Sequence, residues 1–313
     1  MFTSGNIYGY IFNISIYIKY MNKPLIGNGG YLFVINDSAN EIEKHSKEDY
    51  PVNMHHINEY KTMDNFMLLI YPDKSYIYSK YLPDEYNVSY RSVLNKYMEK
   101  LNDKLVDLYD FIKNEDDIYY KTDTHINLKG NYAVFNVFCD IIKNKFNIDI
   151  PKLDINNLDK TVVSRLTNLM IGIGDLTWKS NLGNQTLHDM TDNYYSEKYE
   201  DKNKIYYSKT YINENTHIKL FNESIEKDEI EENYNKLFDW NIISKYIIYK
   251  KNMNCNNNLR IVIFYDSFLA QAIHLFMDLF QEVYFIKRIF NRSLVNTIKP
   301  DYTFEFRVER FLF

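Results

Sequence analysis

Cysteine is scarce in this chain, and its scarcity limits both the fold and the chemistry. Only two of the 313 residues are cysteines, and Cys139 and Cys255 lie far apart. Two cysteines do not make a disulfide framework in a chain of this length. The sequence contains no CxxC or HExxH pattern, so we expect no zinc site and no other metal centre.

An excess of basic residues is also missing. Lysine and arginine number 37 against 42 aspartates and glutamates, which gives a formal net charge of −5. Nucleic acid is therefore not an expected partner. The chain also lacks a glycine-rich loop suited to the pyrophosphate of coenzyme A, so we expect no organic cofactor.

Long apolar runs are absent as well. No stretch reaches the roughly 20 consecutive apolar residues of a membrane-spanning helix. The N-terminal residues have neither a basic n-region nor a small-residue cleavage site, which argues against a signal peptide, and Met21 offers an alternative start. From these features alone the cytoplasm stays open as the compartment.

What the chain does contain is typical of a globular α/β protein. Hydrophobic residues make up 45% and charged residues 25% of the sequence. The last sixty residues predict a strand, a sharp corner, a helix and a further strand, which is the βαβ unit of parallel sheets. We therefore expect an open, mostly parallel sheet with helices on both faces. The segments behind this prediction are strands at 65–71, 259–264, 282–287 and 299–313, and helices at 128–145 and 268–280. The segment 84–114 predicts an amphipathic helix followed by a short strand-like segment.

The domain organisation follows from the same pass along the chain. Residues 1–50 are interpreted as an N-terminal extension with a Gly-rich strand segment, "LIGNGGYLFVIN". Residues 51–313 are interpreted as one domain. Within it, about 151–258 is rich in Asn, Lys, Asp, Glu and Tyr with weak periodicity, which indicates a long, partly irregular insertion.

A serine and an Asp-x-His pair are the candidate reactive groups. Ser267 directly follows the strand at 259–264, and ligands of open α/β sheets bind at such carboxyl ends. The start of the following helix would place backbone N–H groups near a developing oxyanion. His125 is the candidate base, and Asp123 would orient its ring. Local sequence alone favours helix capping by Asp266 and Ser267 over a catalytic role.

Four stretches together resemble the SGNH-hydrolase-like domain of the alginate O-acetyltransferase family, of the AlgX and AlgJ type. They are "GNGGYLFVIND", "YPDKSYIYSKYLP", "YYKTDTHINLKG" and "IVIFYDSF", in the order in which that family has them. The family is circularly permuted, with the Asp-x-His block upstream of the serine, as in this chain. The resemblance implies a three-layer SGNH or flavodoxin-like fold.

The resemblance also implies roles for individual residues. Ser267 would be the nucleophile, His125 the general base and Asp123 its orienting carboxylate. The backbone N–H of Ser267 would be one oxyanion donor. Candidates for the other donors are Gly174 and Asn181, and Asn127 would brace the active-site loop.

The implied activity is polysaccharide O-acetylation through an acetyl-serine, or the closely related O-acetyl esterase reaction. The expected partners are a polysaccharide or oligosaccharide acceptor and a membrane-bound acyltransferase as acetyl donor. Members of the family act in the periplasm or at the cell surface. The resemblance therefore implies the cell envelope as the compartment, whereas the N-terminal sequence leaves the cytoplasm open.

Two departures from the family pattern keep a second function open. Tyr265 stands where the family prefers glycine, and Ile126 replaces its usual tryptophan. Tyr265 could therefore crowd the site or line it. With the Tyr-rich insertion, these departures allow a catalytically inactive glycan-binding or assembly subunit, for which the aromatic candidates are Trp178, Tyr194 and Tyr195.

Overall fold

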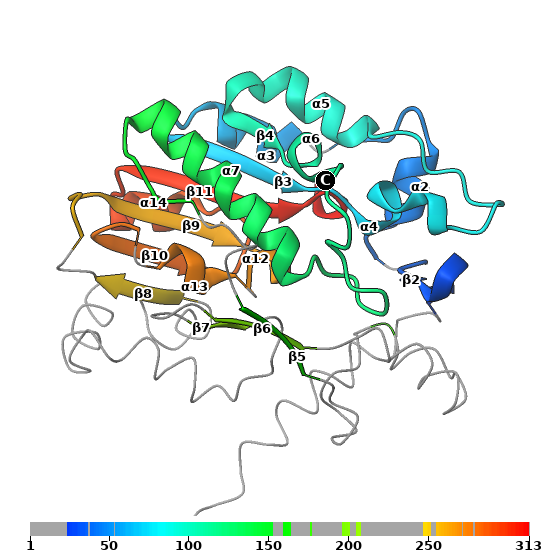
Figure 1. The fold of residues 1–313 in the computed structure, drawn as a ribbon. Helices are drawn as coiled ribbons and strands as arrows, with labels where there is room; N and C mark the ends of the chain where they lie inside the picture. Colours follow the sequence, from blue (N-terminus) through cyan, green and yellow to red (C-terminus); the bar gives the residue numbers. More distant parts are fainter. Residues whose placement is uncertain are drawn as a thin grey trace, which may run out of the picture.

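Figure 1 shows a computed structural model of the protein. It describes most residues of 24–152 and 255–312 and only parts of the region between these two segments. The described residues are 24–36, 38–52, 54–152, 159–163, 176, 196–200, 205–207, 247–251, 255–270, 272–277 and 279–312. Within these residues, no helix combines the length and apolar composition that crossing a bilayer requires.

Six strands form the central sheet: β3 (Phe66–Tyr71), β4 (Leu105–Asp107), β8 (Ile247–Lys251), β9 (Arg260–Tyr265), β10 (Glu282–Ile286) and β11 (Tyr302–Val308). Their order across the sheet is β4-β3-β11-β9-β10-β8. All neighbours are parallel except β10 and β8, which run antiparallel at one edge. The predicted open, mostly parallel sheet is thus confirmed.

Helices cover this sheet. Among the described residues the α-helices are α2 (Glu41–Ser46), α3 (Met54–Lys61), α4 (Lys74–Ile77), α5 (Ser92–Leu101), α6 (Tyr109–Ile112), α7 (Leu128–Phe146), α12 (Ser267–Ala270), α13 (Ile273–Phe276) and α14 (Arg292–Ile298). Short 3-10 helices occur at η1 (Asn28–Gly30), η2 (Ser79–Tyr81), η3 (Asn102–Lys104) and η7 (Glu309–Phe311). Figure 1 shows α7, in green, lying across the near side of the sheet.

The position of β3 in the sheet explains why its sequence is apolar throughout. Successive side chains of a strand point to opposite faces, and those of β3 enter two different cores. Met67, Leu69 and Tyr71 pack in one cluster with residues of α7, α12 and α13. Phe66, Leu68 and Ile70 pack in the other with residues of α3, α5 and α14. Both faces are therefore covered, as a parallel sheet requires.

Strand β11 lies between β3 and β9 and has a different composition. Phe304, Phe306 and Val308 are buried in the core that contains α7. The alternate residues Thr303, Glu305 and Arg307 are also buried. Glu305 accepts a hydrogen bond of 2.6 Å from Arg307 Nε, so the two charged residues of this predicted strand pair with each other inside the protein.

One of the three predicted helices differs from the observed ones. The helix and the strand-like segment predicted in this order within 84–114 are observed as α5 and β4, which begins at Leu105. The helix predicted at 268–280 is two single turns, α12 and α13, because Ala272 leaves the helical region with φ −118° and ψ 5°. The helix predicted at 128–145 is observed as α7.

The segment 151–258 contains regular structure among its described residues. Strands β5 (Asp159–Val163), β6 (Ser196–Glu200) and β7 (Ile205–Tyr207) form a separate antiparallel sheet. Near its end, β8 joins the central sheet as an edge strand. At the N-terminal side, β1 (Leu25–Ile26) and β2 (Leu32–Phe33) form a short hairpin around η1.

Candidate active site

The candidate site lies at the carboxyl edge of the central sheet. Strand β9 ends at Tyr265, and Ser267 begins α12 two residues later. The Ser267 residue is half-buried. This position is the one at which parallel α/β sheets present ligand-binding groups.

Asp266 fixes the corner between β9 and α12. Its Oδ1 accepts a hydrogen bond of 2.9 Å from the Phe268 N–H, and its Oδ2 accepts one of 2.7 Å from the Val308 N–H at the end of β11. The local capping interpretation therefore describes Asp266. Its carboxylate joins two strand ends and sets where the next residue, Ser267, can stand.

The expected oxyanion donors at this corner are fewer than a full helix would supply. The helix α12 has a single turn, so its dipole is small. The Phe268 N–H is already bonded to Asp266. Among the described residues no hydrogen bond uses the Ser267 N–H, so the Ser267 N–H stays a candidate oxyanion donor.

Asp123 and His125 form a close pair on the neighbouring loop. Asp123 Oδ1 lies 2.6 Å from His125 Nδ1 and also accepts the His125 backbone N–H at 3.0 Å. The Asp123 side chain is fully buried, while 14% of the His125 side chain is exposed. A carboxylate can only accept, so Nδ1 carries the ring proton and Nε2 becomes the acceptor nitrogen.

The two halves of the proposed triad are adjacent but not bonded in this structure. The ring of Phe268, which follows Ser267, lies 5.1 Å from the His125 ring between centroids. Among the described residues no hydrogen bond joins the Ser267 hydroxyl to the His125 ring. Catalytic hydrogen bonds are often long without substrate, so the triad stays a prediction for all three residues.

The loop that carries the pair is held at both ends. Tyr119 pairs with Ile126 in an isolated bridge, and the Asn127 N–H donates to the Ile118 carbonyl at 2.8 Å. The Asn127 side chain accepts from the Gly130 N–H and so caps α7, and it donates to the Asp117 carbonyl. These bonds place Asn127 beneath the loop and limit the positions that His125 can take.

Gly130→Ala is expected to lower the free energy of unfolding by about 1–3 kcal/mol. An added Cβ would lie 2.4 Å from Ile126 Cγ1 and 2.8 Å from the Ile118 carbonyl oxygen. This clash outweighs the roughly 1 kcal/mol that alanine gains over glycine within a helix. Urea denaturation measures the change, with Lys129→Ala as the control at about 0.5 kcal/mol or less. A stabilised Gly130→Ala protein would contradict this packing.

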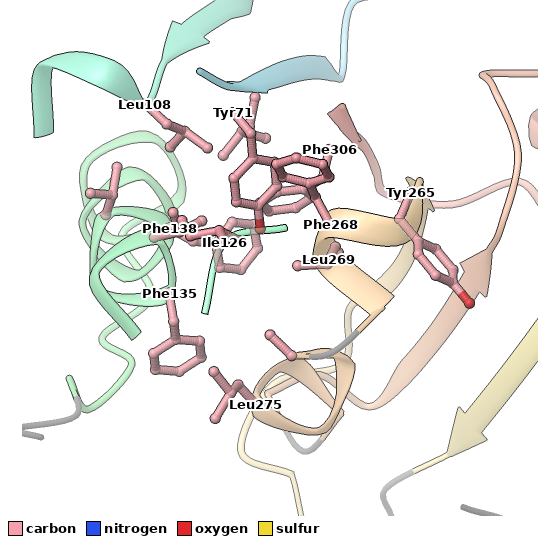
Figure 2. Packing of buried hydrophobic residues seen from close by; sticks show 14 of the residues in the cluster. Tyr71, Leu108, Ile126, Phe135, Phe138, Tyr265, Phe268, Leu269, Leu275 and Phe306 are labelled. Atoms are coloured by element: carbon pink, nitrogen blue, oxygen red, sulfur yellow. The ribbon is translucent and has the colours of Figure 1, made fainter. Parts of the chain in front are cut away.

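The two departures from the family pattern lie in the core. Ile126 and Tyr265 are both buried, and Ile126 packs against Gly130. Figure 2 shows Ile126 close to Phe268, Tyr71 and Phe138, whereas the Tyr265 ring points away from this group. The Tyr265 ring lies 6.4 Å from that of Phe285 on β10. Tyr265 thus packs toward β10, and burial raises the pKa of its hydroxyl.

Several candidate residues cannot be placed. Gly174 and Asn181, the remaining oxyanion candidates, lie outside the described residues, as do Trp178, Tyr194 and Tyr195. Leu176, which lies between Gly174 and Asn181 in the sequence, is described and buried. Its N–H donates to the Thr122 carbonyl at 3.2 Å, and its side chain packs with Leu32 and Val34. Leu176 itself therefore lies against Thr122, the residue before Asp123.

A buried charge cluster near the site was not predicted from the sequence. It consists of Glu41, His45, Asp73, Arg91, Asp107, Glu309 and Arg310, most of them buried. Asp73 accepts hydrogen bonds from His45 Nε2 and Arg310 Nη1, both at 3.0 Å. The Arg310 guanidinium lies 5.1 Å from the centre of the Phe268 ring. The cluster therefore adjoins the residue that contacts His125.

His45 is expected to stabilise the fold at neutral pH and to lose this effect in alkali. Burial alone would lower its pKa, but the hydrogen bond to Asp73 and the charges of Glu309 and Asp73 raise its pKa to about 9. The folded protein binds the proton more tightly than the unfolded chain. The stabilisation, on the order of 2–3 kcal/mol, is therefore complete below about pH 6.5 and lost as pH rises through about 9.

Urea denaturation of the wild type and His45→Gln between pH 6 and 10 measures this effect. The gap in unfolding free energy between the two proteins is expected to be largest at the acid end and to narrow with rising pH. A gap that stays constant over this range would contradict a protonated His45.

Comparisons with known proteins find similar folds. Bacillus cereus PatB1 has a TM-score of 0.58 at 15% identity, covering 91% of this chain and 95% of that one. A DHHW family protein from Eubacterium siraeum has a TM-score of 0.53 at 14% identity, covering 92% and 94%. The O-acetyltransferase domain of Pseudomonas putida AlgJ reaches 0.49 at 12% identity, covering 93% and 92%.

At the level of sequence the result is negative. No protein-family model matches this chain, and no curated protein matches it significantly. The structural likeness extends over nine tenths of the chain. The chain therefore shares its α/β fold, with a mostly parallel six-stranded sheet, with PatB1 and the DHHW family protein.

Proposed function

We propose that this chain is a carbohydrate O-acetyltransferase that uses Ser267 as nucleophile, His125 as general base and Asp123 as the orienting carboxylate. The observation that carries the proposal is the 2.6 Å contact between Asp123 Oδ1 and His125 Nδ1 beside the strand end that bears Ser267. A buried carboxylate that fixes the imidazole tautomer is the arrangement that activates a serine hydroxyl. The motif resemblance and the fold support the same reaction class.

The first half-reaction would load the enzyme. Ser267 Oγ attacks the carbonyl carbon of an acetyl donor while His125 Nε2 takes the hydroxyl proton. Asp123 stabilises the imidazolium through Nδ1, and the Ser267 N–H faces the oxyanion. The proton then passes from His125 to the leaving group, and the acetyl ester of Ser267 remains.

The second half-reaction would transfer the acetyl group from Ser267 to the acceptor. A sugar hydroxyl attacks the acetyl carbonyl while His125 takes its proton, the bond to Ser267 Oγ breaks, and Ser267 regains the proton. Water in place of the sugar gives the O-acetyl esterase reaction. We propose an envelope polysaccharide or oligosaccharide as the acceptor and a membrane-bound acyltransferase as the source of acetyl groups.

Incubation with an activated acetyl ester, with and without an oligosaccharide, tests the reaction. The expected result is acetyl release, an acetylated peptide that contains Ser267, and acetyl transfer to the sugar when sugar is present. Mass spectrometry of the digested protein and of the oligosaccharide measures the two products.

The outcomes separate the candidate functions. Turnover of the acetyl ester without acetylation of the sugar would indicate an O-acetyl esterase rather than a transferase. Binding of the oligosaccharide with no acetyl-Ser267 and no turnover would instead support the glycan-binding subunit that the sequence leaves open.

A further inference from the structure

Lys74 is a buried lysine at the start of α4, two residues after Pro72, which directly follows β3. Its ammonium donates hydrogen bonds to three backbone carbonyls: Leu32 at 2.7 Å, Lys121 at 2.8 Å and Asp123 at 3.0 Å. An ammonium has three N–H donors, so each donor has a carbonyl. One of these carbonyls belongs to the residue that holds His125.

We propose that Lys74 is a positioning residue for the Asp123–His125 pair, acting through the backbone of the loop rather than on substrate. This inference rests on the proposed function and assigns a role to a residue outside the triad. Ordering three carbonyls around one buried cation fixes where the Asp123 main chain lies, and its carboxylate must then meet His125 Nδ1 at 2.6 Å. A displacement of about 1 Å at such a contact can cost 100-fold in rate.

The position of Lys74 is itself fixed by the charge cluster. Its neighbour Asp73 is fully buried and bonded to both His45 and Arg310. The adjacent side chains of Asp73 and Lys74 therefore contact different parts of the protein. Asp73 anchors the segment to the ends of β11 and α2, and Lys74 connects it to the loop of the proposed site.

The three carbonyls also join separate parts of the chain. The Leu32 N–H donates to the Lys121 carbonyl at 2.8 Å, so β2 lies against the loop that Lys74 binds. The ammonium lies 5.3 Å and 5.6 Å from the ring centres of Phe33 and Tyr31. These aromatic faces add a favourable environment for a cation away from bulk water.

Lys44 provides a matched control within the same protein. It is also a buried lysine, and its ammonium donates to the carbonyls of Arg310 at 2.5 Å and Leu312 at 3.2 Å. None of its hydrogen bonds to carbonyls reaches residues 121–127. Lys44→Met therefore removes a comparable cation without touching the loop of the proposed site.

The experiment measures kcat and KM for an activated acetyl ester in a double-mutant cycle of Lys74→Met and Asp123→Asn. Lys74→Met is expected to lower kcat about 10- to 100-fold with KM changed less than about twofold. In the Asp123→Asn background the same change is expected to cost less than about twofold, because the contact that Lys74 positions is already lost. Lys44→Met is expected to keep wild-type kcat.

A purely structural role predicts a different pattern. Losses from Lys74→Met and Asp123→Asn that multiply in the double variant, or an equal loss of kcat in Lys44→Met, would overturn the inference. If Lys74→Met does not yield folded protein, Lys74→Gln replaces it in the same cycle with the same criteria.

The proposed function and this inference fail in different ways. Wild-type turnover by Ser267→Ala would overturn both. Loss of turnover in Ser267→Ala together with wild-type kcat in Lys74→Met would overturn the positioning role alone.

Discussion

Ser267→Ala is expected to lower kcat/KM for an activated acetyl ester by about a thousandfold or more, with the fold intact. The alanine lacks the oxygen that would carry the acetyl group, and removal of a nucleophile is among the largest single effects in enzymes of this type. The Ser267 side chain stands at the start of α12 and holds no strand end together, since Asp266 does that. Acetyl release and thermal unfolding, measured on the same preparation, separate lost chemistry from lost structure.

His125→Ala and the double variant extend this measurement. Residues that act as one catalytic unit show losses that do not multiply. We therefore expect Ser267→Ala/His125→Ala to be no less active than Ser267→Ala alone. Turnover by Ser267→Ala at the wild-type rate would contradict the assignment of the nucleophile.

Arg310→Met is expected to lower the free energy of unfolding by about 3–5 kcal/mol, the cost of leaving buried carboxylates without their cation. Arg310 is buried, and its Nη1 donates to Glu41 at 2.9 Å and Asp73 at 3.0 Å. Methionine fills similar space but neutralises neither carboxylate. Urea denaturation at neutral pH measures the loss.

Arg260→Met is the control for this prediction. Arg260 also pairs with a carboxylate, Glu282 at 2.7 Å, but its side chain is 42% exposed. An exposed pair contributes about 1 kcal/mol or less, so the control is expected to lose much less stability. Equal losses in the two variants would contradict the burial argument.

The effect of Arg310→Met should also depend on pH. Burial and the charge of Asp73 raise the pKa of Glu41, and the charge of Arg310 opposes this rise. Without Arg310 the Glu41 carboxyl is easier to protonate, and a neutral buried carboxyl costs less than a charged one. The deficit relative to wild type is therefore expected to shrink as pH falls.

Most strands of the central sheet were predictable because their sequences are apolar. A run such as Phe66–Tyr71 is apolar at every position, which is typical of a strand covered on both faces. Strand β8 was not predicted, since it lies in the segment interpreted as an irregular insertion. Helix ends were harder to predict. The sequence 268–280 has the apolar face of one helix, yet the chain leaves the helical region at Ala272, with φ −118°, and forms two single turns.

The candidate site was also predictable only in part. Asp123 and His125 are two residues apart, so their contact is local and the motif alone suggested it. The approach of Phe268 to His125 joins segments more than 140 residues apart in a permuted order, and only the sheet places them together. Lys74 was part of a quoted motif, but nothing in its neighbours reveals that its ammonium meets the Asp123 carbonyl.

By itself the sequence determined the class of sheet, the position of α7 and the local Asp-x-His pair, because periodicity and short-range spacing encode them. Tertiary structure alone decided the strand order, the inward direction of Ile126 and Tyr265, and the assembly of the charge cluster from α2 and the ends of β3, β4 and β11. The physical reason is that burial and charge pairing depend on which distant segments meet, and pairing across a sheet has no signature within any one of its strands.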